Sequence, residues 1–420
     1  MAFTAFINWP GAPLTDSLVR RSLSSLSPGP TVVSSLSPDT NRPLLQWSTY
    51  DAIDHELTPS EPKSILSSSY TIRKALIRKH FLHRCIVAYT TKNPNSILHS
   101  SIPKTWDIEI AYADELDDAL WADELWELGE ELQKGDSKWF ILKPGMADRG
   151  MGIRLFNSKE ALEKIFEDFE EDSDDEIEND TNVVTSQLRH FVIQEYAPRP
   201  VLVDPRENRM QSDGGKSIQN DNLKGYKFHL RAYCVASGAL SVYLYPRVLA
   251  LFSSEAYVAP SKSENQHGDI DLRPHLTNTC LQAETGDEYV RLLDELVGLD
   301  VLSGVDDKPE KISKDDIDNL KRQMSEVLAE TFRAAVQMPV HFQPLPNAFE
   351  LFGVDFLVVH NESRENNGSK FQVKLLEINA EPAIEMTGPR LKWILEDLFD
   401  LIGENCVKPF FENIMGQMHV

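Results

Sequence analysis

The segment KWFILKPGMADRGMGIRLF, residues 138–156, decides which fold the sequence can adopt. An apolar strand ends at Lys143 and is followed by a glycine-rich loop and then by a second strand. Glycines allow the backbone to approach an anionic oxygen closely, and a lysine adds a positive charge at the same place. In a dinucleotide-binding fingerprint or a Walker loop, a helix would follow the glycines instead. The segment therefore predicts a phosphate-binding hairpin, although a purely structural turn would have the same composition.

A second segment, YKFHLRA at residues 226–232, alternates charged and apolar side chains. In a strand, Lys227, His229 and Arg231 would lie on one face, with the apolar residues between them on the other. Three potentially cationic side chains on one face repel one another unless an anion lies among them. The pattern fits either an anion-binding site or an exposed sheet face.

The strongest chemical signal comes from two apolar strands, LFGVDFLVV at 351–359 and LLEINAEP at 375–382. Asp355 lies within the first, where a carboxylate is costly to bury without a partner. Period-two alternation places Glu377 and Asn379 on one side of the second. The intervening apolar residues would face the opposite layer: Leu376 and Ile378. Two carboxylates and an amide oxygen are ligands that suit Mg²⁺, although the three could also only hydrogen-bond to one another.

Length and composition predict two or three associated lobes. The 420 residues are too many for one ordinary hydrophobic core, and 41% hydrophobic with 26% charged residues are typical of a globular protein.

No stretch approaches the roughly 20 apolar residues of a membrane-spanning helix. The opening MAFTAFINWPGAPLTD lacks a basic segment before its short apolar run, which argues against a secretory signal. The 4 cysteines show no CxxC spacing, so neither a disulfide framework nor a zinc site is indicated, and a reducing, cytoplasmic compartment is expected.

The charge is unevenly distributed along the chain. A net charge of -24 argues against general nucleic-acid binding, which needs clustered lysines and arginines. The acidic residues are concentrated in the run 167–180. One basic segment could meet an acidic partner or simply form a solvated helix face. It contains Arg73, Lys74, Arg78, Lys79 and Arg84.

Hydrophobic periodicity and turn residues predict the order of the elements. Strands are expected at 3–8, 138–143, 152–156, 191–196, 226–235, 240–245, 351–359 and 371–378. Helices are expected at 70–87, 113–133, 158–169, 287–297, 313–336 and 389–402. Three stretches are expected to be loops: the acidic run that ends near Asp180 and the polar segments 203–225 and 361–369.

These segments resemble, in order and wording, the tubulin-tyrosine ligase family of the ATP-grasp superfamily. The matching phrases are FILKPGMADRGMGIRLF, FVIQEY, KFHLRAY, HLTNTCLQ, FELFGVDFLV and LLEINAEP, and the amino-terminal FINWPGAPLTDSLV resembles the lobe that precedes them. The resemblance implies an α/β (α+β) fold: an ATP-grasp core with central and carboxy-terminal lobes plus a small amino-terminal α/β lobe. The expected boundaries are 1–90, 91–200 and 201–420.

The resemblance also implies a site for ATP and Mg²⁺. The phosphates would be held by Lys143 and the loop residues Arg149, Gly150, Met151 and Gly152. The adenine would be taken by the hinge residues Gln194, Glu195, Tyr196 and Ala197. The nucleotide site would be completed by Lys227, His229, Thr277 and Asn278. The Mg²⁺ ligands would be Asp355, Glu377 and Asn379, and the catalytic residues would be Arg231, Glu377 and Arg247.

Three positions depart from the family pattern. The family usually has Asp where this chain has His229, and a lysine is common where it has Glu195. A family arginine in the strand that follows is displaced here, with Arg247 a few positions away from the expected place. If Arg247 cannot reach the site, the chain would ligate slowly or use another acceptor.

The resemblance implies a ligase that phosphorylates a carboxylate, so that an amine can displace phosphate and form an amide. The leading hypothesis is the addition of tyrosine to the carboxyl terminus of α-tubulin, whose acidic tail would dock on the basic segment. One alternative is a relative that adds glutamate or glycine to tubulin tails. Another is a pseudo-ligase, a nucleotide-binding or interaction module that recruits partners through the loops at 170–190 and 203–225.

Overall fold

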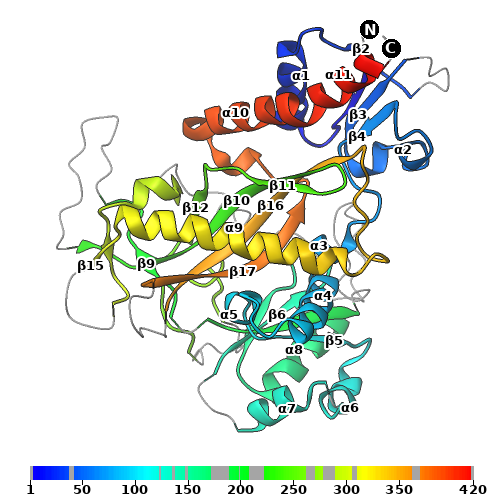
Figure 1. Ribbon diagram of the computed structural model, residues 1–420. Helices are drawn as coiled ribbons and strands as arrows, with labels where there is room; N and C mark the ends of the chain where they lie inside the picture. The colour runs from blue at the N-terminus through cyan, green and yellow to red at the C-terminus, as the bar shows by residue number, and fades with distance from the viewer. Residues whose placement is uncertain are drawn as a thin grey trace.

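The computed structural model describes most of the chain: residues 3–36, 42–122, 124–134, 138–146, 150–171, 189–197, 199–207, 222–261, 270–277, 289–304, 310–361 and 369–417. Figure 1 shows an elongated molecule with a small sheet at one end, a large sheet in the middle and a further sheet at the other end. The expected boundaries near residues 90 and 200 stay a prediction.

The amino-terminal sheet is parallel and has the order β2-β1-β3-β4. Its strands are β1 (Thr4–Asn8), β2 (Thr31–Val33), β3 (Leu44–Ser48) and β4 (Ile65–Ser67). The helices beside it are α1 (Pro13–Ser25), α2 (Leu57–Ser60), α10 (Lys392–Ile402) and α11 (Lys408–Gln417). Trp47 of β3 stacks on Phe399 of α10, with ring centroids 6.0 Å apart. The two ends of the chain therefore share one hydrophobic core.

The central sheet is antiparallel, with the order β5-β8-β6-β7. Its strands are β5 (Thr105–Glu109), β6 (Phe140–Pro144), β7 (Arg154–Phe156) and β8 (His190–Glu195). One face packs on α6 (Leu116–Leu120), α7 (Trp126–Gln133) and α8 (Lys159–Glu171). This packing leaves the other face of β6 and β8 to line a cleft.

The large sheet is antiparallel and has the order β13-β12-β10-β16-β17, with β9 and β11 also paired to β10. Its strands are β9 (Leu202–Val203), β10 (Tyr226–Ser237), β11 (Ser241–Leu244), β12 (Leu249–Phe252), β13 (Val290–Leu292), β16 (Phe349–His360) and β17 (Phe371–Ala380). A separate pair joins β14 (Asp300–Val301) to β15 (Glu310–Lys311).

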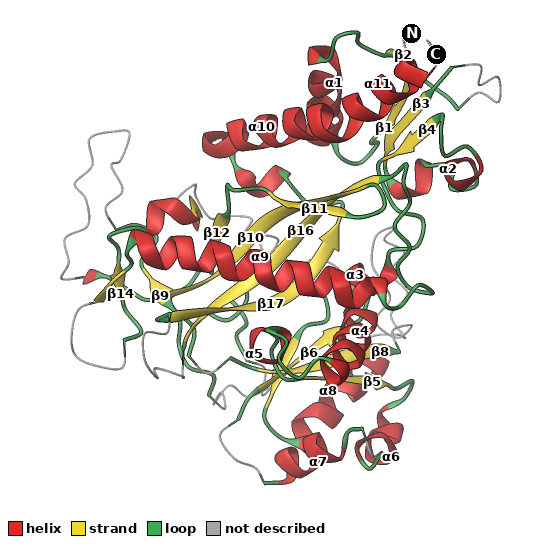
Figure 2. Ribbon diagram, in the orientation of Figure 1, coloured by secondary structure: helices red, strands yellow, loops and turns green. Residues whose placement is uncertain are grey.

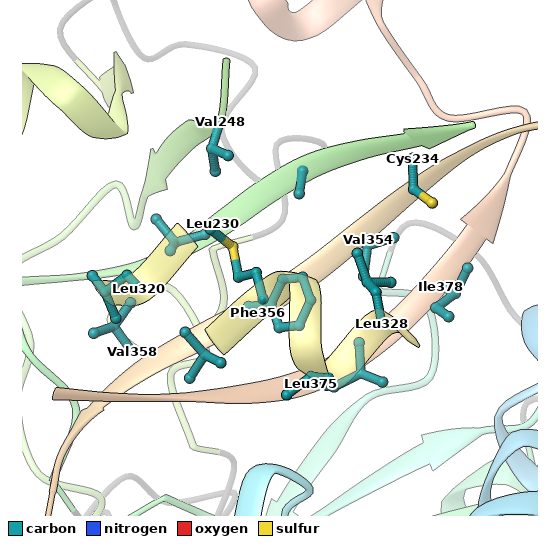
Figure 3. Packing of buried hydrophobic residues seen from close by; sticks show 14 of the residues in the cluster. Leu230, Cys234, Val248, Leu320, Leu328, Val354, Phe356, Val358, Leu375 and Ile378 are labelled. Carbon is teal, nitrogen blue, oxygen red and sulfur yellow. The ribbon is translucent and has the colours of Figure 1, made fainter. Parts of the chain in front are cut away.

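One helix, α9 (Lys314–Val336), lies across one face of the large sheet (Figure 2). It begins at a capping box, in which Ser313 Oγ accepts from the Asp316 N–H at 3.2 Å and Asp316 Oδ2 accepts from the Ser313 N–H at 2.9 Å. Figure 3 shows Leu328 of α9 together with Leu230, Val354 and Ile378 of the strands. Because α9 covers this face, the charged residues that alternate with these apolar ones face the other side.

A β-bulge in β17 changes the predicted alternation. The register of β16 and β17 passes from Asp355 opposite Glu377 to Phe356 opposite Leu375, which leaves Leu376 as the extra residue. Ile378 lies in the core as predicted, but the prediction for Leu376 was wrong: it lines the cleft beside Glu377. A bulge re-aims a side chain by inserting one residue, and period-two reasoning from sequence does not reveal it.

The predicted helix at 313–336 and the long strands are confirmed, whereas other helices differ. The segment 70–87 forms α3 (Lys74–Ile77) and α4 (Lys79–Lys92), and it is followed by α5 (Leu98–Ser101). The segment 113–133 is interrupted between α6 and α7. The prediction of a helix at 287–297 was wrong, because Val290–Leu292 pairs with β12. Among the described residues, no helix has the length and apolar character needed to cross a membrane.

Candidate active site

A cleft lies between β6 and β8 of the central sheet and β10, β16 and β17 of the large sheet. Its polar lining includes Lys143, Gln194, Lys227, His229, Thr277, Asp355 and Glu377. Its apolar lining includes Ile141, Ile153, Leu357 and Leu376. The three segments singled out from the sequence therefore meet in one place, although they are distant in the chain.

Three charged residues lie opposite one another on adjacent strands. Arg231 of β10 pairs in register with Asp355 of β16, and Asp355 pairs with Glu377 of β17. Arg231 donates from Nε to Asp355 Oδ1 at 2.5 Å and from Nη2 to Oδ2 at 2.9 Å. Burial alone would raise the pKa of Asp355, but Arg231 and the nearby His229 hold it well below its usual range. Asp355 is therefore a buried carboxylate that stays ionised.

Asn379 joins the two carboxylates. Its Nδ2 donates to Asp355 Oδ2 and to Glu377 Oε1, each at 3.2 Å. The three oxygen-bearing side chains expected to converge therefore do so. Within the described residues, no group of three or more His, Cys, Asp and Glu side chains is placed to hold a metal ion. A metal at this site would accordingly need the Asn379 amide turned so that Oδ1 rather than Nδ2 faces the two carboxylates, and the resulting set of hard oxygens fits Mg²⁺.

Glu377 has a second charged partner that comes from the amino-terminal part of the chain. Lys79, the first residue of α4, places its Nζ 3.2 Å from Glu377 Oε2. Burial alone would raise the pKa of Glu377, but Lys79 and then Lys143 outweigh burial, and the pKa lies below its usual value. Lys79 thus contributes to the electrostatics of the cleft.

Two buried lysines face the cleft, and each donates a hydrogen bond to an uncharged side chain. Lys143 donates to Gln194 Oε1 at 2.7 Å, and Lys227 donates to the Tyr196 hydroxyl at 3.1 Å. Burial lowers the pKa of Lys143 to about 8, and burial together with the charge of Lys143 lowers the pKa of Lys227 to about 7. A bound anion would offset this cost, because it favours the charged form of both amines.

His229 lies between the lysines and the acidic cluster. Its Nδ1 is 2.5 Å from Thr277 Oγ1, and its Nε2 is 3.5 Å from Asp355 Oδ1. On the neighbouring strand β12, the residue opposite His229 is Leu251, which is buried. On this face of the large sheet, the imidazole of His229 thus lies next to the apolar side chain of Leu251 on the adjacent strand.

The glycine-rich loop has the backbone conformation that its composition suggests. Gly150 and Gly152 have φ values of 78° and 69°, in the region where only glycine is free of strain. A Cβ at Gly152 would also lie 2.7 Å from Pro144 Cγ. Met151 between them is exposed. At Gly152 the backbone, with no side chain, therefore lies close to the end of β6.

A model of the tubulin-tyrosine ligase family matches residues 71–414, which includes the cleft and both walls. The chain belongs to the tubulin-tyrosine ligase family. Members of this family are ligases, so the cleft is the candidate active site of a ligase-type protein.

Curated members of the tubulin-tyrosine ligase family include two yeast relatives. The chain is 39% identical over 386 residues to the probable tubulin-tyrosine ligase PBY1 of Saccharomyces cerevisiae, a match over 88% of this chain and 46% of that protein. It is 37% identical over 388 residues to a probable tubulin-tyrosine ligase of Schizosaccharomyces pombe, over 88% of this chain and 83% of that protein. The chain thus spans less than half of the budding-yeast relative.

A solved structure has the same fold. The crystal structure of the C-terminal domain of Kluyveromyces lactis Pby1 is similar with a TM-score of 0.65 and 32% sequence identity, over 97% of this chain and 94% of that one. That domain is described as an ATP-grasp enzyme that interacts with the mRNA decapping enzyme Dcp2. The expected ATP-grasp fold of this tubulin-tyrosine ligase family member is confirmed.

Most of the site residues expected from the family resemblance lie in or beside the cleft. The exceptions inside the nucleotide set are Arg149 and Asn278, which fall outside the described residues. Glu195 and Ala197 line the cleft with Gln194 and Tyr196, as expected for the hinge.

Arg247 is not brought into the cleft. It is exposed, and its guanidinium lies over the ring of Trp393 in the segment of α10, 5.8 Å from the ring centroid. Because Leu251 occupies the position opposite His229, the described part of β12 offers no arginine there. The expected catalytic role of Arg247 therefore has no support in the geometry.

The basic segment is not a continuous docking surface. Arg73 is buried and forms an ion pair with Glu350, and Lys79 forms an ion pair with Glu377. Lys74 lies on the surface, and Arg78 donates to the Met146 carbonyl at 3.4 Å. Helical periodicity groups these residues, but the break at Arg78 between α3 and α4 directs them to different places.

Two further residues of the site were not predicted from the sequence. His275 Nδ1 is 3.0 Å from the Tyr196 hydroxyl, and Thr105 Oγ1 accepts from Gln194 Nε2 at 3.1 Å. Burial and then Lys227 lower the pKa of His275 to about 4, so this imidazole is neutral. His275 belongs to the phrase HLTNTCLQ, which was the available signal, whereas Thr105 gave none.

Proposed function

We propose that the chain is an ATP- and Mg²⁺-dependent ligase that joins a protein carboxylate to an amine through an acyl phosphate. The observation that carries the proposal is the register of Arg231, Asp355 and Glu377, with Asn379 across the two carboxylates. Asp355 and Glu377 line the same cleft as two buried lysines, Lys143 and Lys227. Lys143 on one wall, and Lys227 with the two carboxylates on the other, fit a nucleoside triphosphate with its metal ion.

Each group has a physical role in this proposal. Lys143 and Lys227 bind and orient the phosphates, while Asp355, Glu377 and Asn379 would hold Mg²⁺, which offsets negative charge during phosphoryl transfer. Arg231 keeps the Asp355 carboxylate ionised and oriented. The apolar walls and the hinge would enclose the adenine. A carboxylate is a poor acyl donor, and phosphorylation supplies its leaving group.

The specific reaction we propose is the addition of tyrosine to the carboxyl terminus of α-tubulin. The names of the two yeast relatives support this choice. A protein named tubulin glycylase 3B from Tetrahymena thermophila is 24% identical over 292 residues, which keeps glycine addition as a variant of the same chemistry. Glutamate addition is a further variant.

A second candidate function is an interaction module with weak or no ligase activity. The observation in its favour is His229, which stands where the family pattern usually has Asp, together with the position of Arg247 over Trp393 and outside the cleft. The described interaction of the Kluyveromyces lactis relative with Dcp2 is in keeping with such a role.

One experiment separates the two. The purified chain is incubated with Mg-ATP, each labelled amino acid in turn, and tubulin, and transfer to protein is measured together with ADP release. Transfer of one amino acid supports the ligase and identifies its amine. ATP binding without ADP release or transfer would favour the interaction module, and absence of ATP binding would refute the nucleotide site.

A further inference from the structure

The glycine-rich loop begins at Gly145, directly after β6, and the first turn of α4 packs against it. The Gly145 N–H donates to the His190 carbonyl of β8 at 2.7 Å, and the Gly145 carbonyl accepts from the Lys79 N–H at 3.2 Å. Lys79 is the first residue of α4, so its N–H has no acceptor within the helix. Both polar groups of the Gly145 backbone are therefore held, one by the central sheet and the other by α4.

The imidazole of His80, the second residue of α4, fills the space beside Gly145. A Cβ at Gly145 would overlap with His80 Nδ1 and would lie 3.0 Å from the His190 carbonyl oxygen. His80 is 2% exposed and stacks on His190, with ring centroids 4.7 Å apart and 15° between the ring planes. A ring that is buried and stacked in this way cannot move aside without disturbing its neighbours. The contact therefore fixes the distance between the loop and α4.

The contact between His80 and Gly145 is one of shape and not of charge. Burial, and then His190, lower the pKa of His80 to about 4, so the imidazole is neutral near pH 7. Its Nδ1 is buried and has no hydrogen-bond partner among the described residues. An unsatisfied buried nitrogen costs free energy, which a residue kept only for core packing would avoid by being apolar.

The same turn of α4 also contacts the large sheet. The side chain of Lys79 pairs with Glu377 of β17, while its backbone N–H holds Gly145. Arg78, just before the helix, donates to the Met146 carbonyl at 3.4 Å. Residues 78–80 thus join the loop that follows β6 to a proposed metal ligand on the opposite wall. A loop displaced from this turn would change its distance from Glu377.

We propose that His80 is a positioning residue, which holds the glycine-rich loop against the first turn of α4 in the place where the loop binds the phosphates of the nucleotide. His80 is not among the residues that line the cleft, so it acts through Gly145. A loop that is held before binding loses less conformational entropy when the phosphates bind. The inference rests on the proposed binding of ATP, but not on which carboxylate or amine reacts.

The test compares ATP with adenosine, which has the same base and ribose but no phosphate. The affinity of the whole chain for ATP is measured by calorimetry, and that for adenosine by competition with ATP. We expect His80→Ala to weaken ATP binding by at least about tenfold, because a misplaced binding group is costly, and to leave the affinity for adenosine unchanged. His341→Ala is the matched control and should change neither affinity, because that imidazole packs on Phe81, the next residue of α4, with ring centroids 4.3 Å apart.

A second variant tests the contact without removing a buried side chain. Gly145→Ala should also weaken ATP binding but not adenosine binding, because its Cβ overlaps with the His80 ring. Removing the imidazole makes room for that Cβ, so the double variant with His80→Ala should bind ATP at least as tightly as Gly145→Ala alone. Losses that multiply in the double variant would show that the two residues act independently, and would overturn the proposal.

The outcomes separate the role of His80 from the ligase function. Equal losses of ATP and adenosine affinity in His80→Ala, or an ATP affinity equal to that of the parent chain, would overturn the positioning role while the ligase proposal stands. A selective loss of ATP affinity, in a parent chain that forms no amide from any amine with Mg-ATP, would support the positioning role and reject the ligase. A parent chain that does not bind ATP would overturn both.

Discussion

Lys79 lies 3.2 Å from Glu377, although 298 positions separate the two residues in the chain (377 minus 79). The lysine begins a helix of the amino-terminal part, and the glutamate belongs to a strand of the large sheet. The contact makes Lys79 part of the electrostatic surroundings of the proposed metal site rather than of a surface for acidic peptides.

Lys79→Met is expected to lower ATP turnover by about ten- to hundredfold, because a hydrogen bond to a charged group contributes about 1.5–3 kcal/mol. Lys74→Met is the matched control, since Lys74 comes from the same basic segment but is exposed. Turnover is measured as ADP release. Equal losses of ATP turnover in both variants would indicate that Lys79, like Lys74, acts only in docking an acidic partner.

Glu377→Gln is expected to reduce ATP turnover by more than about 100-fold while the thermal unfolding temperature stays close to that of the parent chain. A metal ligand supplies several kcal/mol of transition-state stabilisation, and an amide is a weaker ligand than a carboxylate. Glu404→Gln should leave turnover unchanged. A folded Glu377→Gln chain with normal turnover would refute the metal assignment.

ATP binding is expected to take up protons and to weaken as the pH rises above about 8. The pKa values of Lys143 and Lys227, about 8 and about 7, lie below the ordinary lysine value because both amines are buried. Phosphates favour the charged forms, so the bound state holds more protons near neutral pH. Calorimetry in two buffers with different ionisation heats measures the uptake. It should fall in Lys227→Met, and uptake that is identical in the variant and the parent chain would contradict the prediction.

The same lysines affect stability in the absence of nucleotide. Their pKa values are lowered on folding, so between about pH 7 and the unfolded value of 10.5 the unfolded chain binds more protons. The contribution of these two groups to the free energy of unfolding therefore rises with pH in that window. Denaturant unfolding of the parent chain and of Lys227→Met at pH 7 and pH 9 isolates the Lys227 contribution, and an equal pH dependence in both would argue against it.

Arg73→Glu is expected to destabilise the fold by about 3–5 kcal/mol rather than to weaken the binding of an acidic peptide, because it leaves Glu350 unpaired in a buried position. Burial already raises the pKa of Glu350 to about 7 despite Arg73. Chemical denaturation measures the loss. Lys74→Glu should change stability little, and an Arg73→Glu chain of parental stability would show that the pair is not structural.

The chemistry of the cleft could be predicted from local patterns. Strand alternation placed Lys227, His229 and Arg231 on one face, and Glu377 and Asn379 on one side of the next strand, because the period of an extended chain is a local property. The same reasoning failed at Leu376, where the pairing of β16 with β17 accommodates an extra residue. It also failed at 287–297, where pairing with β12 outweighed helical periodicity.

Short stretches of sequence indicate which residues could bind phosphate and metal, since residue type and spacing are local properties. Tertiary packing, by contrast, sets the pairing of Lys79 with Glu377, the burial of Arg73 against Glu350 and the position of Arg247 over Trp393. Those outcomes depend on how helices and sheets from distant parts of the chain pack together. Such packing is set by the burial of whole surfaces, which no single segment specifies.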